Sequence, residues 1–188
     1  MRVSYTYSKS LNNVGEFFFS GPLDPNNIWL DYGRSDNDQR HRLVLQGSVR
    51  TPNAPASTPW EHLTKGWELG GMFQYYSALP FNITTGSNTI QGTSARPTVN
   101  GAFISRNSGE GYNFSNLSAR LSRSFQLSDG VRLQGLVEAF NALNHVNGVT
   151  NNGVFGNGAY PTNPSASFGQ MTSAGEPRSL QLAVRLQF

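Results

Sequence analysis

The sequence predicts an all-β protein: an antiparallel, up-and-down transmembrane β-barrel segment of about six long strands with long outer loops, an incomplete barrel. Six segments alternate apolar and polar side chains, which is the pattern of a strand with one apolar face. Each has about nine to eleven residues, the length that a tilted strand needs to cross a bilayer. Long and shorter connections alternate between the segments, as they do in barrels whose long loops lie on one side of a membrane.

The segments are recognised by apolar residues at every second position. In the last of them, one face carries Leu180, Leu182, Val184, Leu186 and Phe188, and the other carries Gln181, Ala183, Arg185 and Gln187. Such strands are longer than the roughly five or six residues usual in soluble proteins. The expected strands cover residues 2–9, 41–50, 66–76, 116–125, 131–139 and 179–188.

The connections differ in length in a regular order. Ser128-Asp129-Gly130 predicts a tight turn, and a medium, proline-rich link covers residues 51–65. The other three connections, residues 10–40, 77–112 and 140–177, are long and rich in Asn, Gly, Ser, Thr and Pro. Long connections are typical of the outer side of an outer-membrane barrel and short turns of its periplasmic side, so the last strand should end at the periplasm.

Charged side chains are divided unequally between the two faces of the expected strands. Only Lys9 and Arg123 stand at apolar positions, and both lie near strand ends. There a lipid-facing charge costs about 0–1 kcal/mol, compared with about 2–4 kcal/mol at the midplane. We expect Glu138 to pair with an arginine of a neighbouring strand, such as Arg120 or Arg185. The charged residues expected to face the barrel lumen are Arg42, Arg120, Arg132, Glu138 and Arg185.

Aromatic residues stand near the ends of the apolar faces. Trp67, Phe125 and Phe188 are expected on the periplasmic side, and Tyr7 and Tyr75 on the outer side. Two bands of this kind are the aromatic girdles with which a membrane barrel meets the two interfaces of the bilayer.

The composition excludes several classes of protein. Charged residues make up 13% of the 188 residues, compared with about 25% in soluble domains. The basic residues are scattered singly, so we expect no nucleic-acid partner. The chain has no cysteine, which excludes a disulfide framework and a cysteine-based metal site. No segment approaches the roughly 18 consecutive apolar residues of a transmembrane helix.

No residue pattern indicates catalysis, a metal or a cofactor, and we expect none of the three. His41, His62 and His145 are far apart and lack ligand spacing. The stretch "SDNDQR" lacks the glycine and the later glutamate of a calcium-binding loop. The three phenylalanines at residues 17–19 are expected to pack the first outer loop onto its neighbours.

Four stretches resemble the C-terminal barrel segment of TonB-dependent outer-membrane receptors, and most closely the Oar-like group, whose chains carry a carboxypeptidase-regulatory-like domain. They are "SDNDQRHRLVLQGSV", "GWELGGMFQYYSALPFNI", "RLQGLVEAFNALNH" and the terminal strand. Ala78 stands where the group more usually has glycine.

The resemblance implies that residues 1–188 form the C-terminal part of such a barrel, with the plug domain and the earlier strands missing. It also implies a protein of the outer membrane that takes up an unknown substrate, driven by the TonB energy complex through the plug. The last strand is similar to the signal that the barrel-assembly machinery reads, with Gln181, Ala183, Leu186 and Phe188 at its main positions. Alanine at residue 183 replaces the usual glycine.

Two alternatives stay open at this point. Alternating strands are as typical of a soluble β-sandwich, which would here be a secreted or surface glycan-binding protein. A passive outer-membrane channel without a plug would show the same strands and loops.

Overall fold

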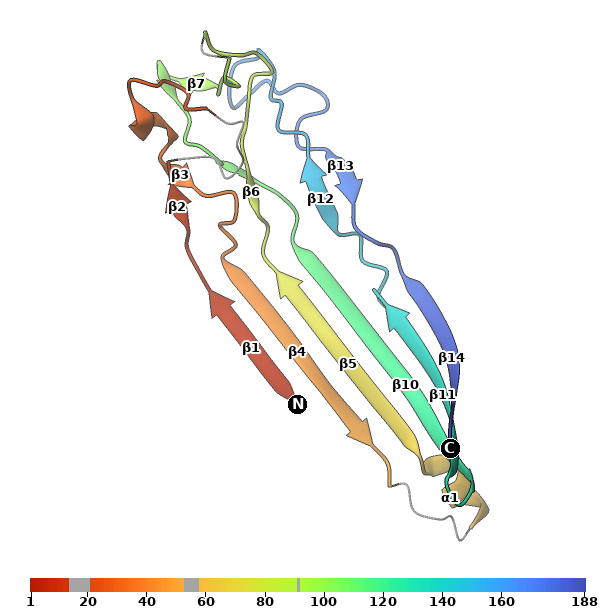
Figure 1. Ribbon diagram of the computed structural model, residues 1–188. Helices are drawn as coiled ribbons and strands as arrows, with labels where there is room; N and C mark the ends of the chain where they lie inside the picture. Colours follow the sequence, from red (N-terminus) through yellow and green to blue (C-terminus); the bar gives the residue numbers. More distant parts are fainter. Residues whose placement is uncertain (14–20, 53–57, 91) are drawn as a thin grey trace.

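One six-stranded antiparallel sheet forms most of the molecule (Figure 1). The computed structural model describes residues 1–13, 21–52, 58–90 and 92–188, so the expected role of the phenylalanines at 17–19 lies outside the described residues. The strand order follows the sequence: β1 (Arg2–Tyr7), β4 (His41–Arg50), β5 (Trp67–Tyr76), β10 (Phe114–Ser128), β11 (Val131–Phe140) and β14 (Ser179–Gln187). All six predicted strands are confirmed, and β1 and β14 are the two edges of a sheet that does not close among the described residues.

β10 is longer than predicted, because its two neighbours are staggered along it. It has 15 residues, whereas the alternating pattern indicated only 116–125. β5 pairs with β10 from Phe114 to Arg123, and β11 pairs with it from Ala119 to Ser128. A stagger of this kind from strand to strand is what tilts the strands of a barrel relative to its axis.

The register places the apolar positions of all six strands on a common face. Val3 lies opposite Leu45, which in turn lies opposite Phe73. On the other half of the sheet, Val137 lies opposite both Leu121 and Leu182, so the alignment continues to the last strand. A slip of one residue in any pair would move that strand's apolar side chains to the polar face. The separation of faces inferred from the sequence is therefore a property of the whole sheet.

The two ends of the sheet are unequal, as predicted. The three long connections all lie at one end (Figure 1). The other end holds the tight turn between β10 and β11, where Gly130 has a φ of 86°, and the short helix α1 (Pro59–Thr64) between β4 and β5. No helix in the described ranges is long and apolar enough to span a membrane.

The long connections, residues 8–40, 77–113 and 141–178, are not structureless. Together they form what we call the outer layer, and each contains short pieces of regular structure that the alternating pattern did not indicate. These pieces are β2 (Leu11–Asn12) with β3 (Gly33–Arg34), the 3-10 helix η1 (Ile28–Asp31), β6 (Pro80–Phe81) with β9 (Gly109–Glu110), β7 (Thr98–Val99) with β8 (Ala102–Phe103), and β12 (Gly148–Asn151) with β13 (Met171–Ala174).

The buried apolar side chains lie in the outer layer and not on the sheet. Among the described residues other than proline, the apolar side chains that are buried are Leu23, Ala78, Ile83 and Phe155. Phe155 is only 2% exposed, and its ring contacts those of Tyr160 and Phe168. A soluble sandwich needs a second sheet packed on the apolar face, and none is present among the described elements.

The third long connection is fixed to the sheet by a side-chain amide. Asn147 accepts a hydrogen bond from the backbone N–H of Ser115 at 2.8 Å and donates one to the carbonyl of the same residue at 3.0 Å. The amide thus does what a backbone peptide of a neighbouring strand would do, at a point where β11 has already ended. Asn147 is 4% exposed, so water cannot easily replace these bonds.

Replacing Asn147 by alanine should loosen the third connection without unfolding the barrel. Two hydrogen bonds are lost and two buried backbone groups are left unpaired, at a cost of roughly 1–3 kcal/mol. Protease cleavage within residues 141–178 should become faster, while the barrel stays resistant in gels run without heating. Asn157→Ala, which changes an exposed residue of the same connection, is the control, and equal cleavage rates in both variants would contradict the role given to Asn147.

Candidate functional site

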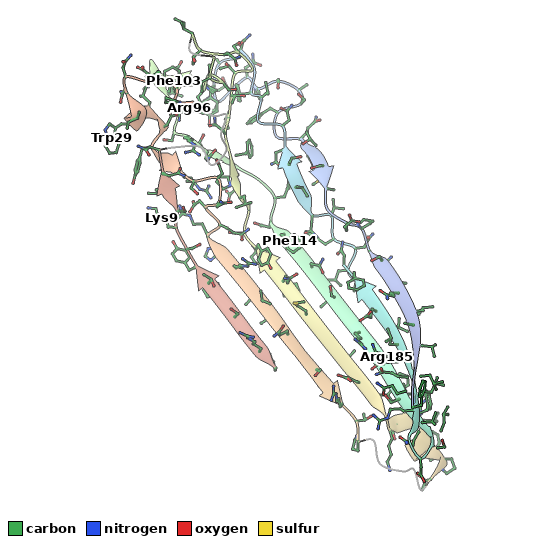
Figure 2. All side chains as sticks on the ribbon, in the orientation of Figure 1. Lys9, Trp29, Arg96, Phe103, Phe114 and Arg185 are labelled. Carbon is green, nitrogen blue, oxygen red and sulfur yellow. The ribbon has the colours of Figure 1, made fainter. Side chains whose placement is uncertain are left out.

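No other described element covers the apolar face of the sheet. Its side chains stand off the strands with no covering layer among the described residues (Figure 2). The large apolar side chains of β14 are more than half exposed, and Leu182 reaches 77%. Contiguous apolar surface of this extent on a folded protein indicates contact with a partner or a membrane.

Aromatic residues border this face at both ends. Tyr7 ends β1 and Tyr75 lies near the outer end of β5, while Trp67 begins β5 at the opposite end. Phe125 and Phe188 belong to the end of the sheet where the C-terminus lies beside α1 (Figure 1). Trp67 and Tyr75 are separated by roughly 26 Å of extended strand, which a tilt of about 40° reduces to roughly 20 Å, close to the height of the apolar band of a barrel.

Lys9 and Arg123, the two charged residues expected on the apolar face, have different surroundings. Lys9 lies beyond the end of β1 (Figure 2), so it is not on the sheet. Arg123 lies within β10, directly opposite Trp67 of β5. Its guanidinium carbon is 5.0 Å from the centroid of the Trp67 ring and 4.6 Å from that of Phe125. The sequence identified all three residues but did not indicate that they form one cluster.

The polar face holds the residues expected to line a lumen. Glu138 pairs with Arg120, with Nη1 and Oε1 3.5 Å apart, as one of the two partnerships that we expected. At the same face, Arg42 stacks over the Tyr76 ring at 4.5 Å. Arg132 and Arg185 lie on the same side of the sheet, opposite Gln187 and Gln134.

A hollow of about 300 Å³ also opens on the polar face, near the end with the short turns. It is lined by charged and polar side chains, including the ion pair of Arg50 with Glu68 at 2.9 Å and, beside it, Arg132. The two faces of the sheet therefore differ sharply in polarity, as they do in the wall of an aqueous lumen.

The residues of the expected assembly signal occupy the outermost strand. Gln181 lies opposite Glu138 and Leu186 opposite Leu133, so they belong to different faces of β14. Ala183 is the only half-buried residue of this strand, and Phe188 follows its end and is 98% exposed. The strand pairs on one edge only among the described strands. Recognition of these residues by an assembly machinery stays a prediction.

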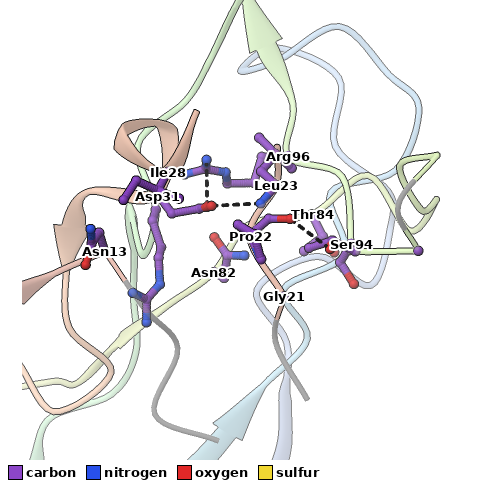
Figure 3. A pocket seen from close by; sticks show the side chains of 13 residues that line it. Asn13, Gly21, Pro22, Leu23, Ile28, Asp31, Asn82, Thr84, Ser94 and Arg96 are labelled. Carbon is purple, nitrogen blue, oxygen red and sulfur yellow. Dashed lines mark hydrogen bonds and ion pairs between the residues drawn. The ribbon is translucent and has the colours of Figure 1, made fainter. Parts of the chain in front are cut away.

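In the outer layer, the second long connection is joined to the first by buried arginines. Arg96 donates to the carbonyl of Leu30 at 2.6 Å and forms an ion pair with Asp31 at 3.1 Å. Asp31 also accepts a hydrogen bond from the backbone of Leu23, which Figure 3 shows beside the pair. Arg106 makes a second such link, to Asn12 at 2.7 Å and to Asp36 at 3.1 Å. A cavity of about 500 Å³ lies between these residues.

The surroundings lower the pKa of two groups in this layer, Arg96 and Asp38. Burial is the main cause that lowers the pKa of Arg96; the neighbouring Arg106 lowers it further, and Asp31 opposes both effects. For Asp38, burial would raise the pKa, but the backbone N–H of Ser10 and the guanidinium groups of Arg34 and Arg40 together bring it below its usual value. The carboxylate of Asp38 is fully covered and contacts these arginines at 2.7 and 2.9 Å.

The histidines lie apart from one another, and hydrogen bonds hold two of them in the structure. His41 shares a hydrogen bond of 2.9 Å with the Tyr5 hydroxyl, and the backbone of His145 is held by the Asn141 side chain. The side chain of His62 lies outside the described part of the chain. Within that part, no three His, Cys, Asp or Glu residues are grouped closely enough to hold a metal ion.

The comparisons with known proteins agree with this geometry. A family model described as an outer membrane beta barrel domain matches residues 1–105 and 98–181, which is nearly the whole chain. The chain belongs to this family. No curated protein and no solved structure gave a significant match. The protein is therefore an outer-membrane β-barrel protein, and the hydrocarbon of the bilayer covers the apolar face of its sheet.

Replacing a leucine by arginine in the middle of the lipid-facing side should lower the unfolding free energy strongly. The same substitution on the polar face should lower it less. Leu182 lies at the centre of β14 on the lipid-facing side, and Leu136 lies on the polar face of the neighbouring β11. Leu182→Arg should lose about 2–4 kcal/mol of unfolding free energy in bilayers. Leu136→Arg, the matched control, should lose clearly less in the same urea titration. Equal losses would mean that lipid does not cover the face of Leu182.

The outer layer should loosen in acid because of Asp38. A carboxylate whose pKa is lowered by folding adds stability above its unfolded pKa, near about 3.9, and loses that stability as the pH falls through the lower folded value. Protease cleavage of residues 8–40 should thus accelerate below about pH 4.

In Asp38→Asn the outer layer should already be loosened at pH 7, by up to about 3 kcal/mol, because two arginines lose their buried partner. The cleavage rate of this variant should vary less with pH than that of the wild type. Glu176→Gln, at an exposed carboxylate, should behave like the wild type, and a wild-type pH profile in Asp38→Asn would contradict the assignment.

Proposed function

We propose that this chain forms part of the wall and three outer loops of a TonB-dependent receptor for active uptake, and that it is not an enzyme. The observation that supports this best is the inequality of the two ends. At the outer end, the first and second long connections are joined by the buried ion pairs Arg96–Asp31 and Arg106–Asp36. Backbone hydrogen bonds of Thr84 with Gly153 and Phe155 join the third connection to the second. Long outer connections and short periplasmic turns are typical of outer-membrane barrels, and a structured outer layer fits a receptor that selects its substrate before the substrate enters the lumen.

The number of strands supports a larger barrel. Even the smallest membrane barrels use eight strands, and the six long strands that the structure describes leave both β1 and β14 with an open edge. Open edges pair readily with other strands. In a complete receptor, further strands would occupy these edges, and a plug domain would fill the lumen that the polar face lines.

The proposed partners follow from this arrangement. Outer-membrane lipid covers the apolar face, and the barrel-assembly machinery reads the terminal strand with Gln181, Ala183, Leu186 and Phe188. The TonB energy complex acts through the plug, and a transported substrate binds at the outer layer and plug. The four stretches similar to the Oar-like group support the coupling to TonB.

A passive channel is the second candidate, because the strands and loops described here fit an open pore equally well. The two differ in whether the lumen conducts ions. In planar bilayers, the complete protein encoded by the gene should show no steady conductance if a plug fills its lumen.

A variant from which the plug is deleted should conduct, and this variant is the control that shows insertion into the bilayer. The periplasmic domain of TonB should bind the complete protein and not the plug-deleted variant. Steady conductance of the complete protein, without TonB binding, would replace the receptor by the passive channel.

A further inference from the structure

Arg123 is the one Arg, Lys, Asp or Glu on the lipid-facing side of the six described strands. The strand β10 continues to Ser128, so Arg123 is not at its end as the sequence indicated. A cation on this face borders lipid hydrocarbon, which cannot solvate it, so it needs partners at the membrane interface.

The protein supplies that arrangement only in part. The rings of Trp67 and Phe125 lie 5.0 and 4.6 Å from the guanidinium carbon and stabilise the cation through their π faces. Neither ring carries a negative charge. The side chain of Arg123 makes no hydrogen bond or ion pair with any residue that the structure describes, and its Nε is buried without an acceptor. The charge of this half-buried arginine is therefore held in place but not neutralised.

A notch in the lipid-facing surface leaves space beside the guanidinium. The residue opposite Arg123 on β11 is Gly135, which has no side chain. A Cβ atom placed on Gly135 would meet no atom within 4 Å. Beyond it on β14 lies Val184, which is 76% exposed. The side of Arg123 away from Trp67 thus opens toward the bilayer.

The cluster of Arg123, Trp67 and Phe125 lies at the depth of the lipid head groups on the periplasmic side of the bilayer. Trp67 belongs to the aromatic band at the end with short turns, and its indole N–H donates to the Leu63 carbonyl of α1 at 2.8 Å. Trp60 and Leu63 of this helix are 77% and 59% exposed. Exposed tryptophan and leucine next to a membrane-spanning segment are typical of the interface between hydrocarbon and head groups.

We propose that Arg123, held between Trp67 and Phe125 and open at the Gly135 notch, binds the phosphate of an anionic phospholipid in the periplasmic leaflet. A guanidinium can donate two parallel hydrogen bonds to a phosphate, which makes arginine suited to this ligand. The acyl chains would then lie along the apolar side chains of β11 and β14. This proposal rests on the outer-membrane location of the chain and not on coupling to TonB.

The test is lipid retention by the complete, assembled protein. Native mass spectrometry in detergent, with phosphatidylglycerol or phosphatidylcholine added as the probe, counts the lipids that stay bound. The wild type should retain one phosphatidylglycerol molecule in preference to phosphatidylcholine. Arg123→Met should bind phosphatidylglycerol roughly tenfold more weakly, the loss expected for a charge-assisted contact.

Two further variants keep the test decisive if Arg123→Met does not assemble. Gly135→Leu fills the notch and leaves Arg123 unchanged, so it should reduce retention as well, and Arg123→Lys should retain an intermediate amount. Arg185→Met, on the polar face, is the control and should bind like the wild type. Retention equal to the wild type in Arg123→Lys and Gly135→Leu, or equal retention of the two lipids, would overturn the proposal.

Discussion

The pairing of strands in register is the constraint on which the rest of the structure depends. A bilayer offers no hydrogen-bond partners to the backbone, so each strand that crosses it must be satisfied by its neighbours. The pairing also fixes which side chains meet lipid, because each strand alternates between the two faces. In this sheet the two requirements coincide: the register that pairs the backbones also aligns Val3, Leu45 and Phe73 with the apolar residues of the strands beyond them.

As a consequence, the buried apolar side chains of the protein lie in the outer layer and not on the sheet. No second layer covers the sheet in the described part of the chain, so lipid chains cover its apolar side chains. The outer layer has to build a small core of its own, around Phe155 and Ile83. Buried ion pairs also contribute to this layer, and two of them, Arg96–Asp31 and Arg106–Asp36, join segments that are distant in the sequence.

Arg123 breaks the separation of the polar and apolar faces, and it does so at a single position of the described strands. The cation has two aromatic neighbours and an adjacent glycine in place of a carboxylate. Positions at which a sequence departs from its own pattern are often functional. The same logic separates this arginine from Arg120 on the other face, whose partner Glu138 is supplied by the next strand.

The sequence by itself determined the six strands, their faces, the tight turn at Gly130 and the end at which the long connections lie. These features depend on local periods and on turn residues, which a single chain displays directly. The small strand pairs of the outer layer, the links of Arg96 and Arg106, and the cluster around Arg123 were decided only by the tertiary structure. They join residues that lie on different strands or different connections, and no local pattern encodes which distant partner a side chain will meet.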